Sequence, residues 1–284
     1  MKRLILLVVL VGVAGIAGIV RSHSRNADFK TYPVGPAGQS ASDLREEIRR
    51  TVELSPGASV EVSGINGAVR IETSTSQTAE VYIERTGSSR EALDRRKVTV
   101  ETSSDGLKIR GEKGDVGFFS KLFGSNPTER VSLKLPRQIS LVTQGVNGSV
   151  VVGEIDGPVE VHGINGKVEV GQAVGSARFK GINGNIAVSL KDITNNGVTI
   201  NGVNGNIELR LSAGLSAQLE AHGMNGRVVS DLPDAVIEKE HHGSFTAHVG
   251  TGGAEINASG INGNIRLTRA GLAQNSRDDS GHGQ

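Results

Sequence analysis

Cysteine and tryptophan are absent from this chain of 284 residues, and its aromatic residues are limited to six phenylalanines and two tyrosines. Without cysteine, neither a disulfide framework nor a lipid-modified cysteine anchor can form. The chain also lacks an excess of charge of either sign, because 31 basic residues stand against 30 acidic ones and the net charge is +1. This balance gives no reason to expect nucleic acid as a partner. The 36% of apolar residues is enough for a thin core of aliphatic side chains.

Glycine is abundant, with 39 residues, and many of these glycines stand in one repeated four-residue phrase. The phrase reads Gly, then Ile, Val or Met, then Asn-Gly, and a branched apolar residue follows two positions beyond it. Its seven copies begin at Gly64, Gly145, Gly163, Gly181, Gly202, Gly223 and Gly260. From the second copy onward, the starts lie 18, 18, 21, 21 and 37 residues apart. Such self-similarity predicts a repeat architecture, in which each unit packs mainly against its neighbours.

The residues between the phrases alternate as β-strands do. Val159 and Val161, and again Val168 and Val170, place apolar side chains on one face of a strand. Asn-Gly tolerates a sharp corner, so an up-and-down meander of hairpins is one solution. The other is a β-solenoid, in which like residues of successive rungs lie about 4.8 Å apart. The return of the same four letters favours the solenoid, because stacked asparagines can then hydrogen-bond along the stack.

We therefore predict an all-β fold, a β-solenoid (β-helix) with rungs of about 18–21 residues that each hold two strands and two corners. The asparagines of the phrases should form a structural ladder at one corner: Asn66, Asn147, Asn165, Asn183, Asn204, Asn225 and Asn262. The rungs are expected to stack in sequence order. On that basis the last interval of 37 residues holds about two rungs with one phrase missing.

The N-terminus has the pattern of an export signal. Lys2 and Arg3 precede an unbroken apolar run over residues 4–20. Residues 1–20 are therefore predicted to be a signal peptide, or an N-terminal membrane anchor if the run is not cleaved. Either outcome places the rest of the chain across a membrane, in the periplasm or at the cell surface. Residues 4–20 would anchor an uncleaved chain in the inner membrane.

Further divisions follow from composition. Residues 21–42 are rich in Ser, Gly and Pro and predict a flexible linker. The β-solenoid domain is expected over residues 43–270, although residues 43–50 fit either a helical turn or the start of a strand. Ser88 and Glu91 have the spacing of a capping box, which predicts a short exposed helix through residues 93–96 whose charges face solvent. Residues 271–284 predict a disordered tail.

A phenylalanine-rich insert at residues 114–128 breaks the repeat. Three of the six phenylalanines fall here, and four apolar residues would share one side of a helix: Phe118, Phe119, Leu122 and Phe123. One interpretation is a plug that covers the open end of the solenoid. The alternative is an exposed patch for a partner protein or a membrane surface.

Candidate catalytic and metal-binding side chains are scattered. His162 and His222 both precede a phrase and are expected three rungs, or roughly 14 Å, apart, which is too far to share a metal ion. The acidic residues of the strands stand singly, with no evident partner, and do not form the facing pair of a glycoside hydrolase. These residues are Glu160, Glu169, Glu208 and Glu220. No nucleophile elbow or phosphate loop occurs in the sequence. We predict no catalytic residue, no metal and no cofactor, and a protein that is not an enzyme.

These motifs resemble those of a known family. The GINGxV and GVNGxI phrases, the KLP stop at residues 134–136 and the closing GTGGAEINASGINGNIRL at residues 250–267 are similar to the bacterial putative-adhesin family of unknown function built from β-strand repeats. They also resemble the related Gly-Ile-Asn head domain of putative autotransporter adhesins. The resemblance covers about three quarters of the chain, from residue 52 to residue 267. It implies a β-helical fold on an exported bacterial protein and no known catalytic residues.

Three functions are compatible with the sequence. The first is a non-enzymatic envelope protein, adhesin-like, whose polar faces bind an unknown protein or glycan. The second is a polysaccharide-active enzyme on the same scaffold. The third is a membrane-tethered accessory or sensor component that acts through the phenylalanine-rich insert.

Overall fold

The computed structural model describes residues 44–114, 126–240 and 243–271. The chain divides into two units, residues 1–40 and 41–284, and the description below concerns the second. The predicted leader at residues 1–20, the linker at 21–42 and the tail after residue 271 lie outside the described residues. So does the apolar patch of Phe118, Phe119, Leu122 and Phe123.

The described part of the chain is all-β, as predicted, and its nineteen strands belong to one sheet that wraps around a single core. Its one helix is α1 (Arg90–Asp94). Over the same residues, no helix has the length and apolar character needed to cross a membrane.

The phrases divide the wrapped sheet into two walls. Strands that lead into a phrase form wall A, and strands that follow it form wall B. Wall A contains β2 (Ala58–Ser63), β8 (Ile139–Gln144), β10 (Val159–Asn165), β14 (Ala217–His222) and β18 (Ala254–Asn262). Wall B contains β3 (Val69–Ser74), β9 (Val150–Ile155), β13 (Ile207–Leu211), β15 (Val228–Ser230) and β19 (Ile265–Arg269). Two long strands, β11 (Val168–Asn183) and β12 (Ile186–Asn204), continue through the second corner and contribute to both walls.

Neighbouring coils pair in parallel and in register. In wall A, Val159 lies opposite Ala177, and Ala177 lies opposite Val198. In wall B, Val168 has Val150 on one side and Ile186 on the other. Residues 18 or 21 positions apart in sequence are thus direct neighbours. Consecutive strands of a meander would instead pair antiparallel, so these coils do not form one.

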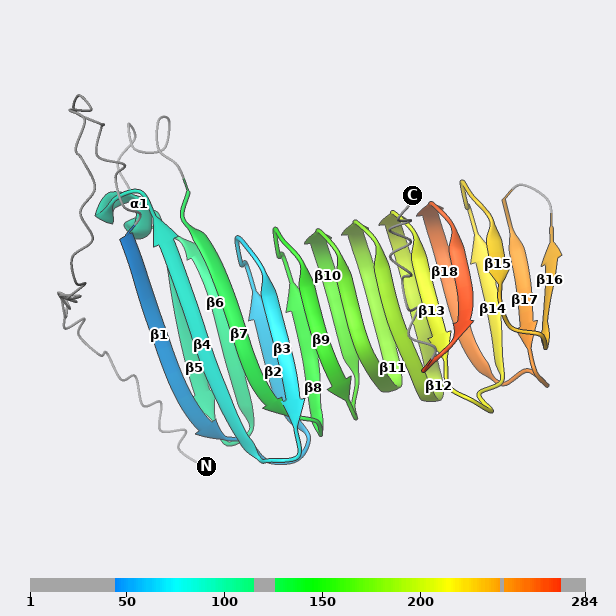
Figure 1. Cartoon of the computed structure of the whole chain (residues 1–284), viewed down its shortest axis with the longest axis horizontal. Helices are drawn as coiled ribbons and strands as arrows, with labels where there is room; N and C mark the ends of the chain where they lie inside the picture. The colour runs from blue at the N-terminus through cyan, green and yellow to red at the C-terminus, as the bar shows by residue number, and fades with distance from the viewer. Residues whose placement is uncertain (1–43, 115–125, 241–242, 272–284) are drawn as a thin grey trace, which may run out of the picture. The chain divides into compact units, whose positions relative to one another are not determined.

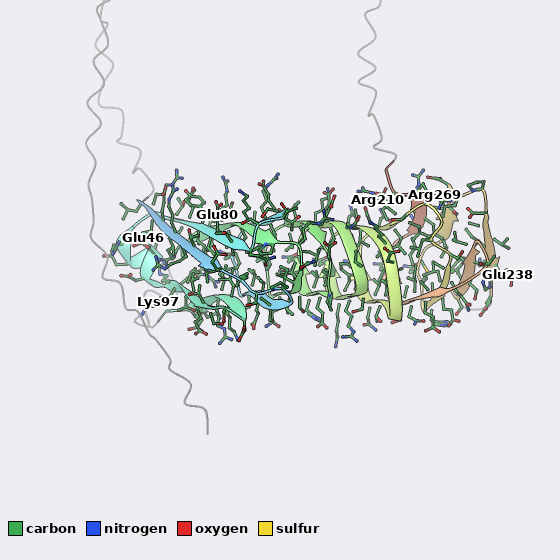
Figure 2. All side chains as sticks on the ribbon, turned by 90° about the horizontal axis from the view of Figure 1, so that it is seen from below. Glu46, Glu80, Lys97, Arg210, Glu238 and Arg269 are labelled. Carbon is green, nitrogen blue, oxygen red and sulfur yellow. The ribbon has the colours of Figure 1, made fainter. Side chains whose placement is uncertain are left out.

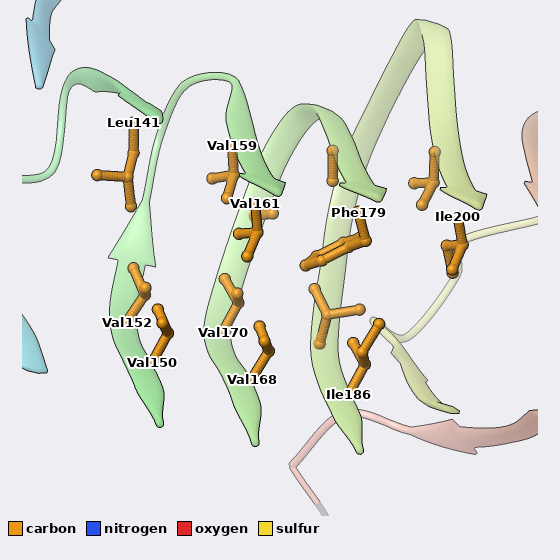
Figure 3. Close-up of a cluster of buried hydrophobic side chains, with 14 of the residues drawn as sticks. Leu141, Val150, Val152, Val159, Val161, Val168, Val170, Phe179, Ile186 and Ile200 are labelled. Carbon is orange, nitrogen blue, oxygen red and sulfur yellow. The ribbon is translucent and has the colours of Figure 1, made fainter. Parts of the chain in front are cut away.

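The core lies between the two walls (Figure 3). Every second residue of each strand points inward, so Val159 and Val161 of wall A face the same interior as Val168 and Val170 of wall B. All four are fully buried, and Phe179 supplies the one aromatic ring of this central cluster. Each buried aliphatic side chain stabilises the fold by roughly 1.5–3 kcal/mol relative to exposure. Short, branched side chains fit because the walls lie close together.

The two glycines and the apolar residue of the phrase each meet a separate structural requirement, as the copy at residues 181–184 shows. Gly181 has a φ of +65°, a conformation that other residues rarely adopt. Ile182 points into the core and is 1% exposed. A Cβ on Gly184 would lie 2.3 Å from the carbonyl oxygen of Gly166 in the preceding coil. Glycine is therefore required at the first position for backbone conformation and at the fourth for close packing of coils.

The coils do not stack in sequence order, contrary to our expectation. The last coil, β18 and β19, lies between its two predecessors: β18 pairs with β12 on one side and β14 on the other. Likewise, β19 pairs with β13 and with β15. Figure 1 shows the orange-red β18 beside the yellow β14. The phrases therefore follow one another along the stack in the order of their first glycines, 64, 145, 163, 181, 202, 260 and 223.

A hairpin at the C-terminal end explains this order. Strands β16 (Ala235–Lys239) and β17 (Phe245–Val249) pair antiparallel, and β17 also pairs antiparallel with β14. Because β17 occupies one edge of β14, the final coil can pair with β14 only along the other edge. The 37-residue interval therefore does not contain a second rung that lacks its phrase, contrary to our prediction. That length forms the hairpin that ends the stack.

The N-terminal end is closed by antiparallel strands. Wall B continues from β3 through β7 (Thr128–Pro136) and β4 (Thr78–Gly87) to β1 (Leu44–Glu53). Wall A continues from β2 through β6 (Gly106–Lys113) to β5 (Arg96–Ser103). Residues 44–50 thus belong to a strand, which resolves the open alternative. The predicted short helix is present but lies earlier than expected, at Arg90–Asp94 rather than through residues 93–96, and Ser89, rather than Ser88, caps it by accepting from the backbone N–H of Ala92.

Candidate functional site

The seven asparagines of the phrases form one continuous hydrogen-bonded ladder. Each Nδ2 except that of Asn66 donates to the Oδ1 of the asparagine one coil nearer the N-terminal end, at 3.0–3.1 Å. Along the stack the order is Asn66, Asn147, Asn165, Asn183, Asn204, Asn262 and Asn225. The amides all point the same way because each donor must meet an acceptor. This corner therefore holds the coils in register.

The first amide of the ladder is held by the N-terminal cap. Asn66 Nδ2 donates to the carbonyl oxygen of Pro127 at 2.8 Å, and its backbone N–H donates to Glu129 Oε2 at 2.8 Å. The side chain of Glu129 is fully buried and pairs with Arg96 Nε at 3.0 Å. Arg96 also donates to the carbonyl oxygen of Gly64. Our prediction that the charges of residues 90–97 face solvent is therefore wrong for Arg96.

A second column of asparagines was not predicted from the sequence. Three phrases are followed directly by asparagine, and these side chains accept hydrogen bonds from the backbone of the adjacent coil. Asn185 Oδ1 accepts from the N–H of Asn206 at 2.9 Å, and Asn206 Oδ1 accepts from the N–H of Asn264 at 3.0 Å. Asn264 Oδ1 in turn accepts from the N–H of Arg227 at 3.1 Å. The pattern that could have revealed this column is the asparagine directly after the phrase, which then reads GINGN or GVNGN.

Wall A presents polar side chains to solvent in rows that run across the coils. Glu160 lies opposite Arg178, and Arg178 Nη1 donates to Glu160 Oε1 at 2.8 Å. His162 Nε2 lies 3.2 Å from Glu160 Oε2. Hydrogen bonding to His162, then to Arg178, lowers the pKa of the Glu160 carboxyl. Farther along the row, Asn201 Nδ2 donates to Ser259 Oγ at 2.7 Å.

The histidines of wall A lie farther apart than predicted. Between His162 and His222 stand Lys180, Asn201 and Ser259, so four coil steps separate the two, not three. The inserted last coil causes the difference. In the parts of the chain that the structure describes, no three His, Asp or Glu side chains gather as a metal site would require.

We expected the strand carboxylates to lack partners. Each of them instead has a hydrogen-bonding or ion-pairing partner two residues away in sequence. Glu169 Oε2 lies 2.6 Å from Lys167 Nζ, Glu208 Oε1 lies 3.0 Å from Arg210 Nε, and Glu220 Oε1 accepts from Gln218 Nε2 at 2.9 Å. Residues i and i+2 of a strand share a face, which is why these pairs form. The hydrogen bond from Lys167 lowers the pKa of Glu169.

The outer face of wall B carries a groove of about 440 Å³ between the ends of β3 and β9. Its sides carry Arg70 and Glu72 of β3 and, opposite them, Glu154 of β9 and Arg137. The two outer faces are seen in Figure 2, where Glu80 and Arg210 extend from wall B and Lys97 extends on the opposite side. Most charged side chains of both walls point to solvent, with Arg85 and Glu129 as buried exceptions.

No protein-family model and no curated protein sequence matches the chain. Among solved structures, it is similar to a putative cell adhesion protein from Clostridium sporogenes, with 14% identity, a TM-score of 0.39 and coverage of 80% of this chain and 100% of that one. A putative adhesin from Bacteroides fragilis has 13% identity and a TM-score of 0.33, over 78% of this chain and 97% of that one. A putative adhesin from Parabacteroides merdae has 14% identity and a TM-score of 0.27, over 79% and 97%. These three solved structures are thus bacterial proteins described as a putative cell adhesion protein or as putative adhesins.

Proposed function

We propose that the chain is an exported, non-enzymatic protein of the cell envelope, a β-solenoid that acts as an adhesin-like binding module. The in-register stacking of the coils is the observation that carries this function. It places side chains of equivalent positions in straight rows with a spacing of about 4.8 Å. A ligand with its own repeat, such as a glycan, can contact several coils at once, and linked contacts add affinity.

The composition of the rows supports binding through many polar contacts. Wall A offers carboxylate, guanidinium, imidazole, amide and hydroxyl groups within neighbouring coils: Glu160, Arg178, His162, Asn201 and Ser259. Such groups hydrogen-bond to sugar hydroxyls or to the polar surface of a protein. The partner we propose is therefore a glycan or a protein on another surface.

The state of the carboxylates favours binding over polysaccharide cleavage. A glycosidase needs a general acid whose pKa is raised, facing a second carboxylate. Here hydrogen bonds from His162 and Lys167 lower the pKa of Glu160 and Glu169, respectively. Hydrogen bonding to Lys108 does the same for Glu61. These groups stay ionised at neutral pH, as ion-pair partners rather than as proton donors.

Export is the part of the proposal that rests on sequence alone. Lys2 and Arg3 precede the apolar run of residues 4–20, the pattern of a segment that directs a chain across a membrane. We propose a periplasmic or cell-surface location. If the segment is not cleaved, residues 4–20 hold the chain in the inner membrane.

The full chain, purified in mild detergent, tests the proposal on arrays of immobilised glycans and extracellular-matrix proteins. We expect saturable binding to at least one of the two classes, with loss of binding after heat unfolding. Incubation with the bound glycan should release no reducing ends. Release of reducing ends would support the enzyme instead. Absence of binding to both classes would contradict the proposed module.

A further inference from the structure

One extra residue in two neighbouring coils interrupts the regular outer surface of wall B. Between its inward residues Val170 and Ala173, β11 has two residues, whereas β12 has one between Val188 and Leu190. Strand β9 matches β11 in register through Ile155, so it carries the same extra residue. This is the count that defines a β-bulge. Bulges redirect side chains and end the pairing of strands.

The bulge separates β9 from β3 and opens the groove. The two strands pair only as far as Ile71 and Val152. Beyond that point the hydroxyl of Thr73 replaces a backbone partner, because Thr73 Oγ1 accepts from the N–H of Glu154 at 3.0 Å. Gly153 has no side chain to fill the space, and the resulting groove has a volume of about 440 Å³.

Opposed ion pairs line this groove. On the β3 side, Arg70 Nε lies 3.0 Å from Glu72 Oε1. On the other side, Arg137 Nη2 lies 2.5 Å from Glu154 Oε2. Two guanidinium groups and two carboxylates leave the four with no net charge. Ile71 and Val152 also border the groove, but their side chains are buried in the core.

One polar atom of the groove lining, and one on the neighbouring strand β11, make no hydrogen bond to the described residues. Ser74 Oγ, which belongs to the lining, is shielded from solvent and makes no hydrogen bond. Gln172 Nε2, on the strand next to Glu154, is likewise shielded and unbonded. Buried polar groups are nearly always hydrogen-bonded in folded proteins. The unpaired hydroxyl of Ser74 therefore points to a ligand or ordered water that bonds to it in the groove.

We propose that this groove is the subsite that holds a neutral, multiply hydroxylated ligand, a sugar unit of an uncharged glycan. This inference rests on the adhesin-like function proposed above and locates its ligand-binding site in the groove. Sugar hydroxyls both donate and accept, which suits a lining of guanidinium, carboxylate and hydroxyl groups. An anionic sugar would meet Glu72 and Glu154 without an excess of positive charge to offset them.

The groove is open toward the next coil, where Gly171 lies against Gly153: a Cβ on Gly171 would be 3.3 Å from the carbonyl carbon of Gly153. Gly171 is exposed, so no side chain blocks this path. A linear glycan with one unit in the groove can therefore continue over the neighbouring coil. The site thus fits an internal unit of a chain as well as a terminal one.

The test uses the full chain in detergent and fluorescent tetrasaccharides, neutral ones from dextran, mannan and chitin and an acidic one from pectin. The double substitution Arg70→Ala with Glu72→Gln removes one side of the groove. We expect it to weaken binding of the preferred neutral probe by about 10- to 100-fold, the effect of losing one or two hydrogen bonds to charged groups. A second variant, Ser74→Val, should also weaken binding without disturbing the ion pairs.

A matched control lies elsewhere on wall B, where Arg266 Nη2 and Asp231 Oδ2 are 2.6 Å apart. Arg266→Ala with Asp231→Asn should leave binding unchanged. Thermal unfolding of each variant shows that it is folded. If a neutral probe binds but the groove variants bind it as well as the parent, the groove assignment is overturned while the adhesin-like function stands. Preference for the acidic probe also overturns the assignment. If no probe binds and the matrix proteins do, the groove fails and the binding module survives; if neither class binds, both proposals fail.

Discussion

At the residue scale, the asparagine of each phrase explains why one four-letter sequence returns seven times. An interior amide donates to one neighbour and accepts from the other, so its contribution depends on both adjacent coils. Asn183, for example, donates to Asn165 and accepts from Asn204. Among the described residues, the side chain of Asn225 at the C-terminal end of the ladder makes only the donated bond to Asn262. Position along the ladder, rather than residue type, should decide the effect of a substitution.

This difference gives a first prediction. Asn183→Ala should lower the free energy of unfolding by about 1–3 kcal/mol, because it removes two hydrogen bonds whose net contributions are about 0.5–1.5 kcal/mol each. Asn225→Ala should cost about half as much. Urea unfolding of both variants measures the difference. Equal losses would show that the amides act independently of the ladder.

The ionised carboxylates give a second prediction. The pKa values of Glu61, Glu160 and Glu169 are lowered from 4.5 in the folded chain, chiefly by hydrogen bonds from Lys108, His162 and Lys167. The stabilisation that they provide is therefore complete above about pH 4.5, and it is lost as the pH falls through the folded-state pKa values.

Melting temperature should accordingly fall on acidification below about pH 4.5. Glu160→Gln, which cannot titrate, should show a shallower fall than the parent. Thermal unfolding followed by circular dichroism from pH 7 to pH 3 provides both curves. Parallel curves for the two proteins would contradict the role assigned to Glu160.

At the scale of elements, the two edges of β14 determine where the chain ends. One edge pairs with β17 and the other with β18. Apart from the chain connection, β14 and β15 reach the preceding coils only through β18 and β19. The last coil is therefore an internal layer of the stack although it is the last to be synthesised.

Removal of this coil provides the third prediction. Truncation after Gly250 deletes four large buried aliphatic side chains, Ile256, Ile261, Ile265 and Leu267. Their burial contributes roughly 6–12 kcal/mol at about 1.5–3 kcal/mol each, comparable to the whole stability of a typical domain. We expect the truncated chain to lose several kcal/mol of unfolding free energy or to fail to fold.

The control for this prediction is truncation after Gly271, which retains every contact described here. It should unfold at the same urea concentration as the full chain. A chain cut after Gly250 that matched both in midpoint and in slope would contradict the internal position of the last coil.

The elements also show what the sequence could predict. Alternation of apolar residues gives the two walls, and the period of 18–21 residues gives the coils, because both depend on local patterns. The order of the coils is not local: every coil carries the same phrase and a compatible apolar face, so any two could be neighbours. The hairpin of β16 and β17 decides the order by occupying an edge. Residues 43–50 were ambiguous for a similar reason, since it is pairing with β4 that makes residues 44–50 a strand.

The groove could not be predicted from the sequence either. Gly153-Glu154 and Gly171-Gln172 form bulges only in comparison with β12, where the corresponding segment is one residue shorter. Without the register of adjacent coils, the extra residue cannot be located. The ion pair of Arg96 with Glu129 joins residues 33 positions apart, and the mixed charges around Arg96 in the sequence gave no sign that its side chain would be buried.

At the scale of the whole molecule, one arrangement of the coils underlies the features described above. Parallel neighbours in register produce the aliphatic core, the asparagine ladder and the outer rows on which the proposed binding function depends. Wall A carries the extended polar rows and wall B the groove. Both lose their geometry if the coils are shifted by one position in the stack.

Disulfide trapping tests this arrangement directly, because the chain has no cysteine of its own. Asn201 and Ser259 face each other in adjacent coils, whereas Asn201 and His222 have Ser259 between them. Adjacent coils place the Cα atoms about 4.8 Å apart, within the range of about 4.4–6.8 Å that a disulfide spans; two coils give about 9.6 Å. Mild oxidation followed by peptide mass analysis should therefore detect a disulfide in the variant with Asn201→Cys and Ser259→Cys, and none in that with Asn201→Cys and His222→Cys. The reverse result would show that the coils stack in sequence order and would contradict the arrangement described here.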